Sequence, residues 1–596
     1  MDKTVQTAQE QPSQVTKQKG VSHQTQGSCG QEPATIAKPM VSRRSFLSGA
    51  AALGASLAAV GLSGCAQPKA AAERPAQATE STQENWWGSP SDEASFNITE
   101  ELETDILVCG CGHAGMTAAL AAAQTGAVLV IEKTATYGIF RTFPGAVGSR
   151  IQHAAGVDID KLELSNEIMR YASGRANQDI VNLWINESGE WLDWFTELIE
   201  PEGVYLTAEP DVGDGWHGSY RAWPTSLVEH IPEERADHAA ATPSMGPILV
   251  DLAQKMGVDF RYNTELVQFI KEGDRVVGCI AKTGSSYIRI KASRGTLLCT
   301  GGYEGNAELM QKLNPVASST VTCAQYMLQN DGAGMKAGIW AGGVKDGNPT
   351  AMLFDRGGIA PGLEAGFPVQ GQLFWMGSQP FLKVNTQGKR IGNEDVPYDS
   401  MIASASLQKD HLWCSIWDAN YQEDIKTFHT LCCSRIDPSP TPDSWSFTYE
   451  AIAGMNEGLK AQGIIFECDT LEELAEKLQI PVDDFMQTVQ EYNALCESGK
   501  DTHFGKASKD MRPLTTPPYS GCRVGSALLC TLDGLRIDTD CHLLSENGTP
   551  ISGLWAAGNC TGGFFSDNYP ELIPGVASGR TATQARHAVL NMLGLK

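Results

Sequence analysis

Short apolar runs alternate with stretches of small and polar residues from about residue 104 onwards. The first run, Asp105-Ile-Leu-Val-Cys-Gly, leads into small residues from Met116 to Ala123, and a second run, Val128-Leu-Val-Ile, ends at Glu132. Brief apolar runs bounded by glycine are typical of buried strands, and small residues between them are typical of a closely packed helix. The pattern therefore predicts a strand, a helix and a second strand over residues 104–132.

The pattern continues to about residue 343, weakens over residues 344–529, and returns near the C-terminus. Residues 266–271 and 275–281 predict a hairpin, and Gly295-Thr-Leu-Leu-Cys predicts another buried strand. Between residues 344 and 529 the alternation weakens, with helices expected over 471–478 and 483–495, and the strand–helix texture returns at 551–593. The predicted fold class is α/β. A Rossmann-like domain (104–343 and 530–596) is interrupted by an inserted α+β domain (344–529).

The N-terminal segment has a different character. Residues 1–41 are polar and predict a disordered region. Residues 42–65 run from Ser42-Arg-Arg-Ser-Phe to Leu62-Ser-Gly-Cys65 and predict a twin-arginine signal with a lipoprotein cleavage box, followed by a linker over 66–103. We expect export by the twin-arginine route and an extracytoplasmic, membrane-anchored protein lipidated at Cys65. The alternative is a plain signal peptide with an incidental cysteine.

Charge and cysteine content exclude several classes of function. The formal net charge of −25 argues against nucleic-acid binding and against a broad hold on anionic lipid, so membrane contact is expected through the lipid anchor only. The 16 cysteines lack the spacing of a disulfide framework, of c-type haem attachment or of an iron–sulfur site. No metal site is predicted, and most cysteines are expected to act as small apolar core residues.

A glycine fingerprint follows the first predicted strand. Gly110 permits a tight turn, Gly112 lets the backbone approach a pyrophosphate, and Gly115 allows the helix to pack closely on the strand. Glu132, at the end of the next strand, suits the ribose hydroxyls of a dinucleotide. An ordinary strand–helix turn is the alternative, but it leaves Glu132 unexplained.

Several other segments occur in a characteristic order with this fingerprint: Glu132-Lys133, Cys299-Thr-Gly-Gly, Gln387-Gly-Lys-Arg-Ile-Gly-Asn-Glu, Tyr492-Asn with Gly499-Lys-Asp-Thr-His-Phe-Gly, and Gly553-Leu-Trp-Ala-Ala-Gly. Together, from Thr104 to Leu593, they resemble the FAD-dependent fumarate reductase/succinate dehydrogenase flavoprotein family. That family includes flavocytochrome fumarate reductases, urocanate reductases and 3-ketosteroid dehydrogenases.

The resemblance implies non-covalent FAD and hydride transfer from flavin N5 to an activated carbon–carbon double bond, or the reverse reaction. It also implies that substrate lies between the flavin and the inserted domain. The expected cofactor-binding residues are Gly110, Gly112, Ala114, Gly115, Glu132, Lys133, Gly138, Gly145, Val267, Thr300, Gly301, Gly302, Gly332, Gly334, Gly558, Asn559 and Ala577.

The chain departs from the fumarate reductases at the expected catalytic positions. Tyr398 stands where those enzymes carry a proton-donating arginine, Cys530 replaces a histidine, and Tyr569 replaces a second, substrate-clamping arginine. Tyrosines cannot hold a dicarboxylate by bidentate ionic bonds, so we expect a neutral enone, a phenolic acrylate or a steroid-like substrate rather than fumarate. Tyr398 would donate the proton or begin a relay resupplied by Glu394 and Arg390, while Tyr569 and Cys530 contact the activating group.

Other interpretations stay open. Both tyrosines could be packing residues, with an arginine supplied from elsewhere, such as Arg356 or Arg390, as in a dicarboxylate reductase. The enzyme could run in reverse as a ketosteroid-type dehydrogenase, which Gly575 and Gly579 weakly favour. A third interpretation is that the protein is a non-catalytic flavoprotein that carries electrons. Because the sequence shows no second redox motif, a separate electron donor is expected, either a membrane cytochrome or a flavin or haem carrier.

Overall fold

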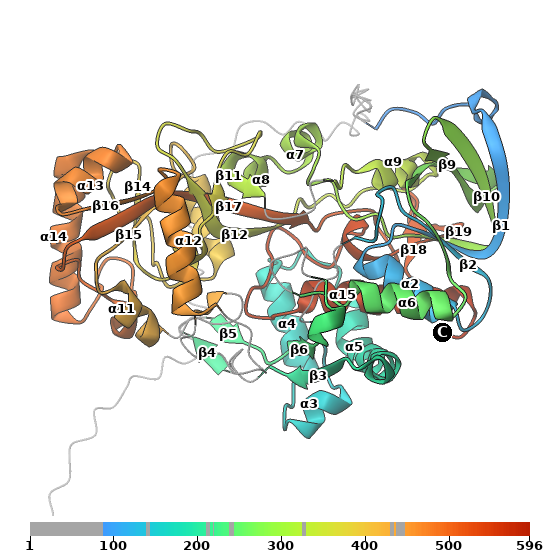
Figure 1. Ribbon diagram of the computed structural model, residues 1–596, viewed down its shortest axis with the longest axis horizontal. Helices are drawn as coiled ribbons and strands as arrows, with labels where there is room; N and C mark the ends of the chain where they lie inside the picture. Colours follow the sequence, from blue (N-terminus) through green and yellow to red (C-terminus); the bar gives the residue numbers. More distant parts are fainter. Residues whose placement is uncertain are drawn as a thin grey trace, which may run out of the picture. The chain divides into compact units, whose positions relative to one another are not determined.

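Two β-sheets organise the part of the chain that the computed structural model describes, namely residues 87–138, 144–209, 215–217, 220–237, 243–324, 329–428, 434–436 and 447–596. These residues belong to one unit, Glu84–Lys596 (Figure 1). The predicted N-terminal region, the export signal and most of the linker lie outside the described residues.

The first sheet has a parallel centre. Strands β7, β2, β1, β10 and β19 pair in parallel in that order, and β18 adds to β19 in the antiparallel sense. The hairpin β8–β9 pairs with β10 and confirms the expected hairpin. The strands are β1 (Ile98–Cys109), β2 (Val128–Ile131), β7 (Asp259–Arg261), β8 (Thr264–Glu272), β9 (Arg275–Thr283), β10 (Ser286–Leu298), β18 (His542–Leu544) and β19 (Pro550–Ala556).

Helices α2 (His113–Ala122), α6 (Gly246–Lys255) and α15 (Val576–Met592) gather on one side of this sheet (Figure 1). α2 is made almost entirely of small buried residues, which lets it lie close to both β1 and α15. It begins three residues earlier than the expected Met116, directly after the glycine turn. Other helices in this half of the chain are α3 (Arg150–Ala154), α4 (Lys161–Tyr171), α5 (Gln178–Ile199) and α9 (Ala333–Trp340). α7 (Ala307–Leu313) and α8 (Pro315–Thr320) pack on each other, and α8 contacts β17 (Tyr519–Thr531) of the second sheet.

The second sheet is built around one long strand, β17. β12 and β11 pair with the C-terminal half of β17, whereas β15 and β16 pair with its N-terminal half. The strands are β11 (Val321–Ala324), β12 (Ala351–Ile359), β13 (Gln372–Leu373), β14 (Leu382–Asn385), β15 (Trp413–Trp417), β16 (Ile465–Cys468) and β17 (Tyr519–Thr531). Two small two-stranded sheets, β3 (Tyr205–Ala208) with β6 (Leu227–His230) and β4 (Gly215–His217) with β5 (Tyr220–Ala222), lie apart from it.

Helices accompany the second sheet as the sequence pattern suggested. α13 (Leu471–Leu478) coincides with the expected segment, and α14 (Val482–Ser498) contains the other. The remaining helices of this part are α10 (Tyr398–Ser406), α11 (Tyr421–Phe428) and α12 (Tyr449–Ala461). The predicted α/β fold class is confirmed.

The expected domain limits at 343 and 529 do not coincide with the limits of the sheets. β11 joins the second sheet before residue 344, and β17 continues to Thr531. β17 therefore runs from the outer part of the second sheet, where Tyr519 pairs with Cys468, to Cys530 near the first sheet. The domain assignment itself stays a prediction.

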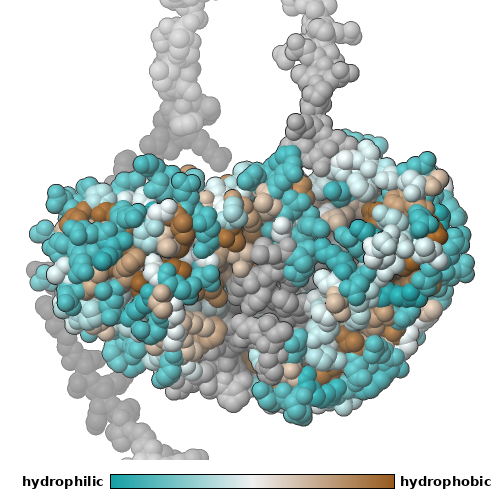
Figure 2. Space-filling view, turned by 45° about the horizontal axis from the view of Figure 1, so that its top comes forward, coloured by the Kyte–Doolittle hydropathy of each residue, from teal (hydrophilic) through white to brown (hydrophobic). Residues whose placement is uncertain are grey.

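In the described part of the chain the cysteines are mostly buried, and the face in Figure 2 is mostly hydrophilic. Twelve cysteines there are free thiols, and all but Cys496 are buried. On the face in Figure 2, hydrophilic side chains predominate and hydrophobic ones form scattered patches. Among the described residues no helix is both long and apolar enough to cross a membrane.

We expect Gly115→Ala to destabilise the fold even without a cofactor. A Cβ at Gly115 would lie 1.9 Å from the Gly110 carbonyl oxygen, a backbone atom that cannot move aside without shifting β1 from α2. The expected loss is at least about 1–3 kcal/mol of unfolding free energy, measured by chemical denaturation of cofactor-free protein. Gly454→Ala is the matched control, because a Cβ in that exposed helical position meets nothing within 4 Å. Equal stability of the two variants would contradict this account of the turn.

Candidate active site

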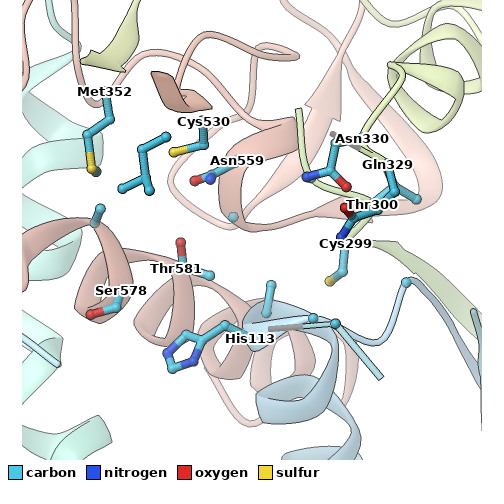
Figure 3. A pocket seen from close by; sticks show the side chains of 18 of the residues that line it. His113, Cys299, Thr300, Gln329, Asn330, Met352, Cys530, Asn559, Ser578 and Thr581 are labelled. Atoms are coloured by element: carbon cyan, nitrogen blue, oxygen red, sulfur yellow. The ribbon is translucent and has the colours of Figure 1, made fainter. Parts of the chain in front are cut away.

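A cavity of about 500 Å³ opens between the two sheets, lined by residues from both. Figure 3 shows Thr300, Gln329 and Asn330 at one end and Met352 and Cys530 at the other, with Asn559 between them. His113 from α2 and Thr581 from α15 also border the space. The cavity thus extends from the carboxyl edge of the first sheet to β12 and β17 of the second.

The glycine turn forms one wall. Gly110 has a φ of +103°, and a Cβ there would lie 2.4 Å from the Cys299 carbonyl oxygen. Gly112, by contrast, faces open space, because a Cβ there meets no atom within 4 Å. Gly112 also precedes the first residue of α2, whose N-terminal amides are available to an anion. The turn therefore has the shape that a pyrophosphate requires.

Glu132 is held at the end of β2. One carboxylate oxygen accepts a hydrogen bond from the Cys111 amide at 2.9 Å, and the other accepts from the Thr134 amide and hydroxyl, both at 2.9 Å. The carboxylate lines the cavity beside Lys133, which pairs with Asp331 at 3.3 Å. This arrangement fixes an acid where a nucleotide ribose would lie.

Later strands complete the wall. Gly301 and Gly558 both have positive φ, at +73° and +81°. Asn559 accepts a hydrogen bond through Oδ1 from Arg580 at 3.1 Å, which leaves its amide nitrogen as a donor. Within the described structure the Thr300 and Ser226 hydroxyls are buried at the cavity without a hydrogen-bond partner. Buried polar atoms of this kind fit a bound polar cofactor.

Most of the expected cofactor residues meet at this cavity. The residues that line it are Gly110, Gly112, Ala114, Glu132, Lys133, Gly138, Thr300, Gly301, Gly334, Gly558, Asn559 and Ala577. The expected residues that do not line it are Gly115, Gly145, Val267, Gly302 and Gly332.

Backbone packing explains those five exceptions. Gly115, Gly145 and Gly302 each lie where a Cβ would meet a neighbouring atom within 2.5 Å, so they allow close packing behind the wall. Gly332 supplies a left-handed turn, with φ +82°, at the start of α9. Val267 lies at an irregularity between Leu266 and Gln268 in the β8–β9 ladder, and Glu265 and Leu266 line the cavity instead.

The far end of the cavity brings Tyr398 and Tyr569 together. Both are buried, and their rings are parallel within 4° with centroids 6.5 Å apart. Phe354 meets the Tyr398 ring edge-on at 4.9 Å. Cys530 pairs with Met352 across the β12–β17 ladder, so their side chains border the same region (Figure 3). Three of the five expected catalytic residues therefore converge.

Arg356 also lines this end, as the alternative interpretation anticipated. Its side chain is 0% exposed, and its guanidinium lies 4.0 Å from the centroid of the Trp375 ring. Its Nε donates to the Ser378 hydroxyl at 2.7 Å and its Nη2 to the Ser434 hydroxyl at 3.3 Å. Alternation along β12 explains its placement, because Met352, Phe354 and Arg356 are two residues apart and all line the cavity.

Arg390 and Glu394 are not brought to the cavity lining. Arg390 makes paired hydrogen bonds to Glu394, both at 2.8 Å, and binds Asp501 at 2.9 Å. Glu394 also faces Lys506 at 3.6 Å. This buried ionic cluster lies at the loop that precedes α10. Arg390 therefore does not line the cavity as the substrate arginine of the alternative interpretation would, and the relay role of Arg390 and Glu394 behind Tyr398 stays a prediction.

Sequence reasoning missed the remaining residues of the far end. These are Glu209, Leu373, Trp375, Phe447, Met455 and Leu529. Glu209 is buried against Arg435, whose side chain reaches it from a segment more than two hundred positions away. Apart from the alternation of β12, no local pattern in the sequence distinguishes these residues from ordinary core residues.

Comparison with known proteins agrees with this geometry. The family model described as "FAD binding domain" matches residues 105–571, which is most of the chain. This chain belongs to that family. Within it the chain groups with the fumarate reductase flavoproteins, and it is an FAD-dependent oxidoreductase acting on CH–CH groups.

Three known proteins illustrate the similarity. Vinyl phenol reductase of Lactiplantibacillus plantarum is 28% identical, over 81% of this chain and 97% of the relative. A probable fumarate reductase of Shewanella frigidimarina is 25% identical, over 78% of this chain and 71% of the relative. The structure of 3-ketosteroid Δ1-dehydrogenase from Sterolibacterium denitrificans shares the fold, with a TM-score of 0.64 and 19% identity over 83% of this chain and all of that one.

We expect Gly112→Val to abolish FAD binding while leaving the cofactor-free fold intact. Its φ of −86° is open to any residue, and the valine side chain would project into space where no protein atom lies within 4 Å. Flavin absorbance of purified protein and reconstitution with FAD measure the loss, and circular dichroism measures the fold. A yellow Gly112→Val protein with full FAD content would contradict the assignment of the turn.

Proposed function

We propose that this protein reduces the activated carbon–carbon double bond of a small organic acceptor with one activating group, such as an enone, a phenolic acrylate or a steroid-like molecule. The observation that supports this proposal is the far end of the cavity, where two parallel tyrosines and one buried arginine are surrounded by aromatic and methionine side chains. Among the described residues that line the cavity, Arg356 is the sole arginine, which suits one acceptor group better than two carboxylates.

Each residue then has a defined chemical task. Bound FAD supplies hydride chemistry, and the chain orients the substrate and delivers a proton. A phenol is protonated at neutral pH, so Tyr398 can give a proton to the carbon next to the one that receives hydride. Tyr569, Cys530 and Arg356 would hold the activating oxygen, on which negative charge develops. The aromatic wall of Phe354, Trp375 and Phe447 would hold a flat substrate body.

The relatives support the same class of chemistry. Vinyl phenol reductase acts, by its name, on a vinyl group attached to a phenol, and it matches this chain over nearly its whole length. The reverse reaction is the second candidate, because a 3-ketosteroid Δ1-dehydrogenase shares the fold. Anaerobic reoxidation of the reduced protein by unsaturated acceptors, compared with its reduction by saturated ketones, separates the two directions.

Cofactor attachment and cellular context are also part of the proposal. FAD is bound without a covalent link, so denaturation and filtration should release it into the filtrate. The electrons come from a separate donor protein, either a membrane cytochrome or a flavin or haem carrier. We further propose that the protein is exported folded by the twin-arginine route and anchored through a lipid on Cys65.

We expect Tyr398→Phe to slow substrate-driven flavin oxidation by a factor of ~10² to 10⁴ while FAD stays bound. The phenyl ring preserves the contacts with Phe354 and Tyr569, so the change removes the hydroxyl alone. Rates are measured by stopped-flow after chemical reduction, with a panel of enones, aryl acrylates and steroids. Tyr287→Phe, in a tyrosine that packs on Phe96 outside the cavity lining, is the control.

Fumarate decides the substrate class in the same assay. The unaltered protein should reduce fumarate much more slowly than the best acceptor of the panel, because the expected second guanidinium is replaced by Tyr569. Tyr398→Phe should not restore fumarate reduction. If fumarate is reduced as fast as any enone or acrylate, the tyrosine argument fails and the protein is a dicarboxylate reductase.

We expect the double change Arg43→Lys, Arg44→Lys to trap the precursor inside the cell, since the export machinery reads the arginine pair. Cys65→Ala should release the exported protein from membranes or block its processing. Cell fractionation and immunoblotting measure both effects. Unchanged fractionation in both variants would remove the signal and the lipid anchor from the proposal.

A further inference from the structure

The loop between β19 and α15 connects one cavity residue to a buried acid. Tyr569 lines the cavity, and Glu571, two residues later, is 6% exposed. Backbone hydrogen bonds fix this loop, because the Leu572 carbonyl accepts from the Trp223 amide at 2.9 Å and the Pro574 carbonyl accepts from the Thr225 hydroxyl at 2.7 Å. The position of Glu571 is therefore coupled to the position of the Tyr569 ring.

The Glu571 carboxyl also caps the helix that carries Tyr398. Its Oε2 accepts a hydrogen bond from the Tyr398 backbone amide at 2.9 Å, across 173 positions of sequence. Tyr398 is the first residue of α10, and the preceding Pro397 has no polar side chain to cap the helix. First-turn amides have no partner within their own helix, so a buried one needs an outside acceptor.

The other oxygen of Glu571 leads to Arg356. The Ser434 hydroxyl donates to Oε1 at 2.5 Å, and the same hydroxyl accepts from Arg356 Nη2 at 3.3 Å. Glu571 is thereby linked to three residues of the far end: to Tyr569 through two residues of backbone, to Tyr398 through its backbone amide, and to Arg356 through the Ser434 hydroxyl.

We propose that Glu571 is a positioning residue that sets the separation of the Tyr398 and Tyr569 rings and the direction of the Arg356 guanidinium at the substrate end of the cavity. This inference rests on the proposed function for its kinetic consequences. The geometric part of the inference, that Glu571 determines the position of the Tyr398 ring, does not depend on which substrate is reduced.

Because the Glu571 carboxyl is mainly neutral, glutamine is a close mimic of it. Burial raises the pKa of Glu571 from its ordinary value of 4.5 to about 8, so the carboxyl is mainly neutral at pH 7. A neutral acid offers one carbonyl oxygen and one hydrogen-bonding hydroxyl, and a glutamine amide of similar shape offers one oxygen and an N–H group. Glutamine can therefore still accept from the Tyr398 amide through its oxygen. Its N–H group keeps the hydrogen bond to Ser434 when the serine hydroxyl turns to accept instead of donating, whereas leucine can make neither bond.

The test compares Glu571→Gln and Glu571→Leu with a buried acid elsewhere. Asp418 is 3% exposed, lies outside the cavity lining, and accepts from the amides of Thr515 and Thr516, both at 3.0 Å. Asp418→Leu thus removes a buried carboxyl that, like Glu571, accepts from backbone amides of a distant segment. We expect Glu571→Leu to lower kcat roughly 10- to 100-fold with normal FAD content, and Glu571→Gln to stay within about threefold of the unaltered protein. Asp418→Leu should lower Tm without changing kcat.

A double-mutant cycle separates positioning from general stability. Because part of the effect of Glu571 runs through Tyr398, Glu571→Leu should cost clearly less rate in a Tyr398→Phe background than in the unaltered protein. Independent, multiplicative losses would overturn the proposal. So would a Glu571→Leu protein with normal kcat, or an Asp418→Leu protein with an equal fall in kcat.

Fluorine NMR keeps the inference testable if no acceptor is reduced. Fluorotyrosine placed at position 398 should change its resonance in Glu571→Leu and keep it in Glu571→Gln and Asp418→Leu. An unchanged resonance in Glu571→Leu would refute the positioning role. Absence of any double-bond reduction with a shifted resonance would refute the proposed function alone.

Discussion

The cavity exists because strands from distant parts of the sequence end at the same edge of one parallel sheet. β1 ends before Gly110, β2 before Glu132, β10 before Thr300, and β19 before Gly558. Parallel pairing of β2, β1, β10 and β19 brings these four ends together, and all four residues line the cavity. Ligands of open α/β sheets bind beyond the carboxyl ends of the strands for this reason. The glycines matter because the backbone of one strand end must pass within contact distance of the next.

A different constraint governs the far end, where charges are taken out of water. Arg356, Asp355 and Lys383 are nearly inaccessible, as is the mainly neutral Glu571, and burial of unpaired charges would cost several kcal/mol. Serine hydroxyls link these groups: Ser434 joins Arg356 to Glu571, and Ser378 joins Arg356 to Asp355. Such a network holds the guanidinium against Trp375, so the position of this cationic group at the cavity is fixed by protein contacts alone.

The sequence predicted the nucleotide end of the cavity well and the substrate end only in part. Gly110, Gly112 and Glu132 lie within one short unit whose local chemistry determines its shape, so their pattern could be interpreted directly. Val267 does not line the cavity, whereas its neighbours Glu265 and Leu266 do, because the β8–β9 ladder is irregular between Leu266 and Gln268, and the residue types there do not predict that irregularity. Arg390 and Glu394 pair with each other in the loop before α10, and their motif alone could not show that Asp501 and Lys506 join them in a buried ionic cluster. The role of Glu571 could not be predicted from the sequence, because its contacts are with residues 137 and 173 positions away.

The two halves of the site depend on each other through β12 and β17. Cys530 ends a strand whose other end belongs to the outer part of the second sheet, and Met352 pairs with it across the ladder. Any displacement of the second sheet along β17 would therefore move Cys530 relative to Asn559, which belongs to the first sheet (Figure 3). The Glu571 contact opposes such a displacement, because it ties α10, which packs on β12, to a loop of the first sheet. The relative placement of the residues at the two ends of the cavity thus rests on a few buried polar contacts between the sheets, such as the one from Glu571 to the Tyr398 amide.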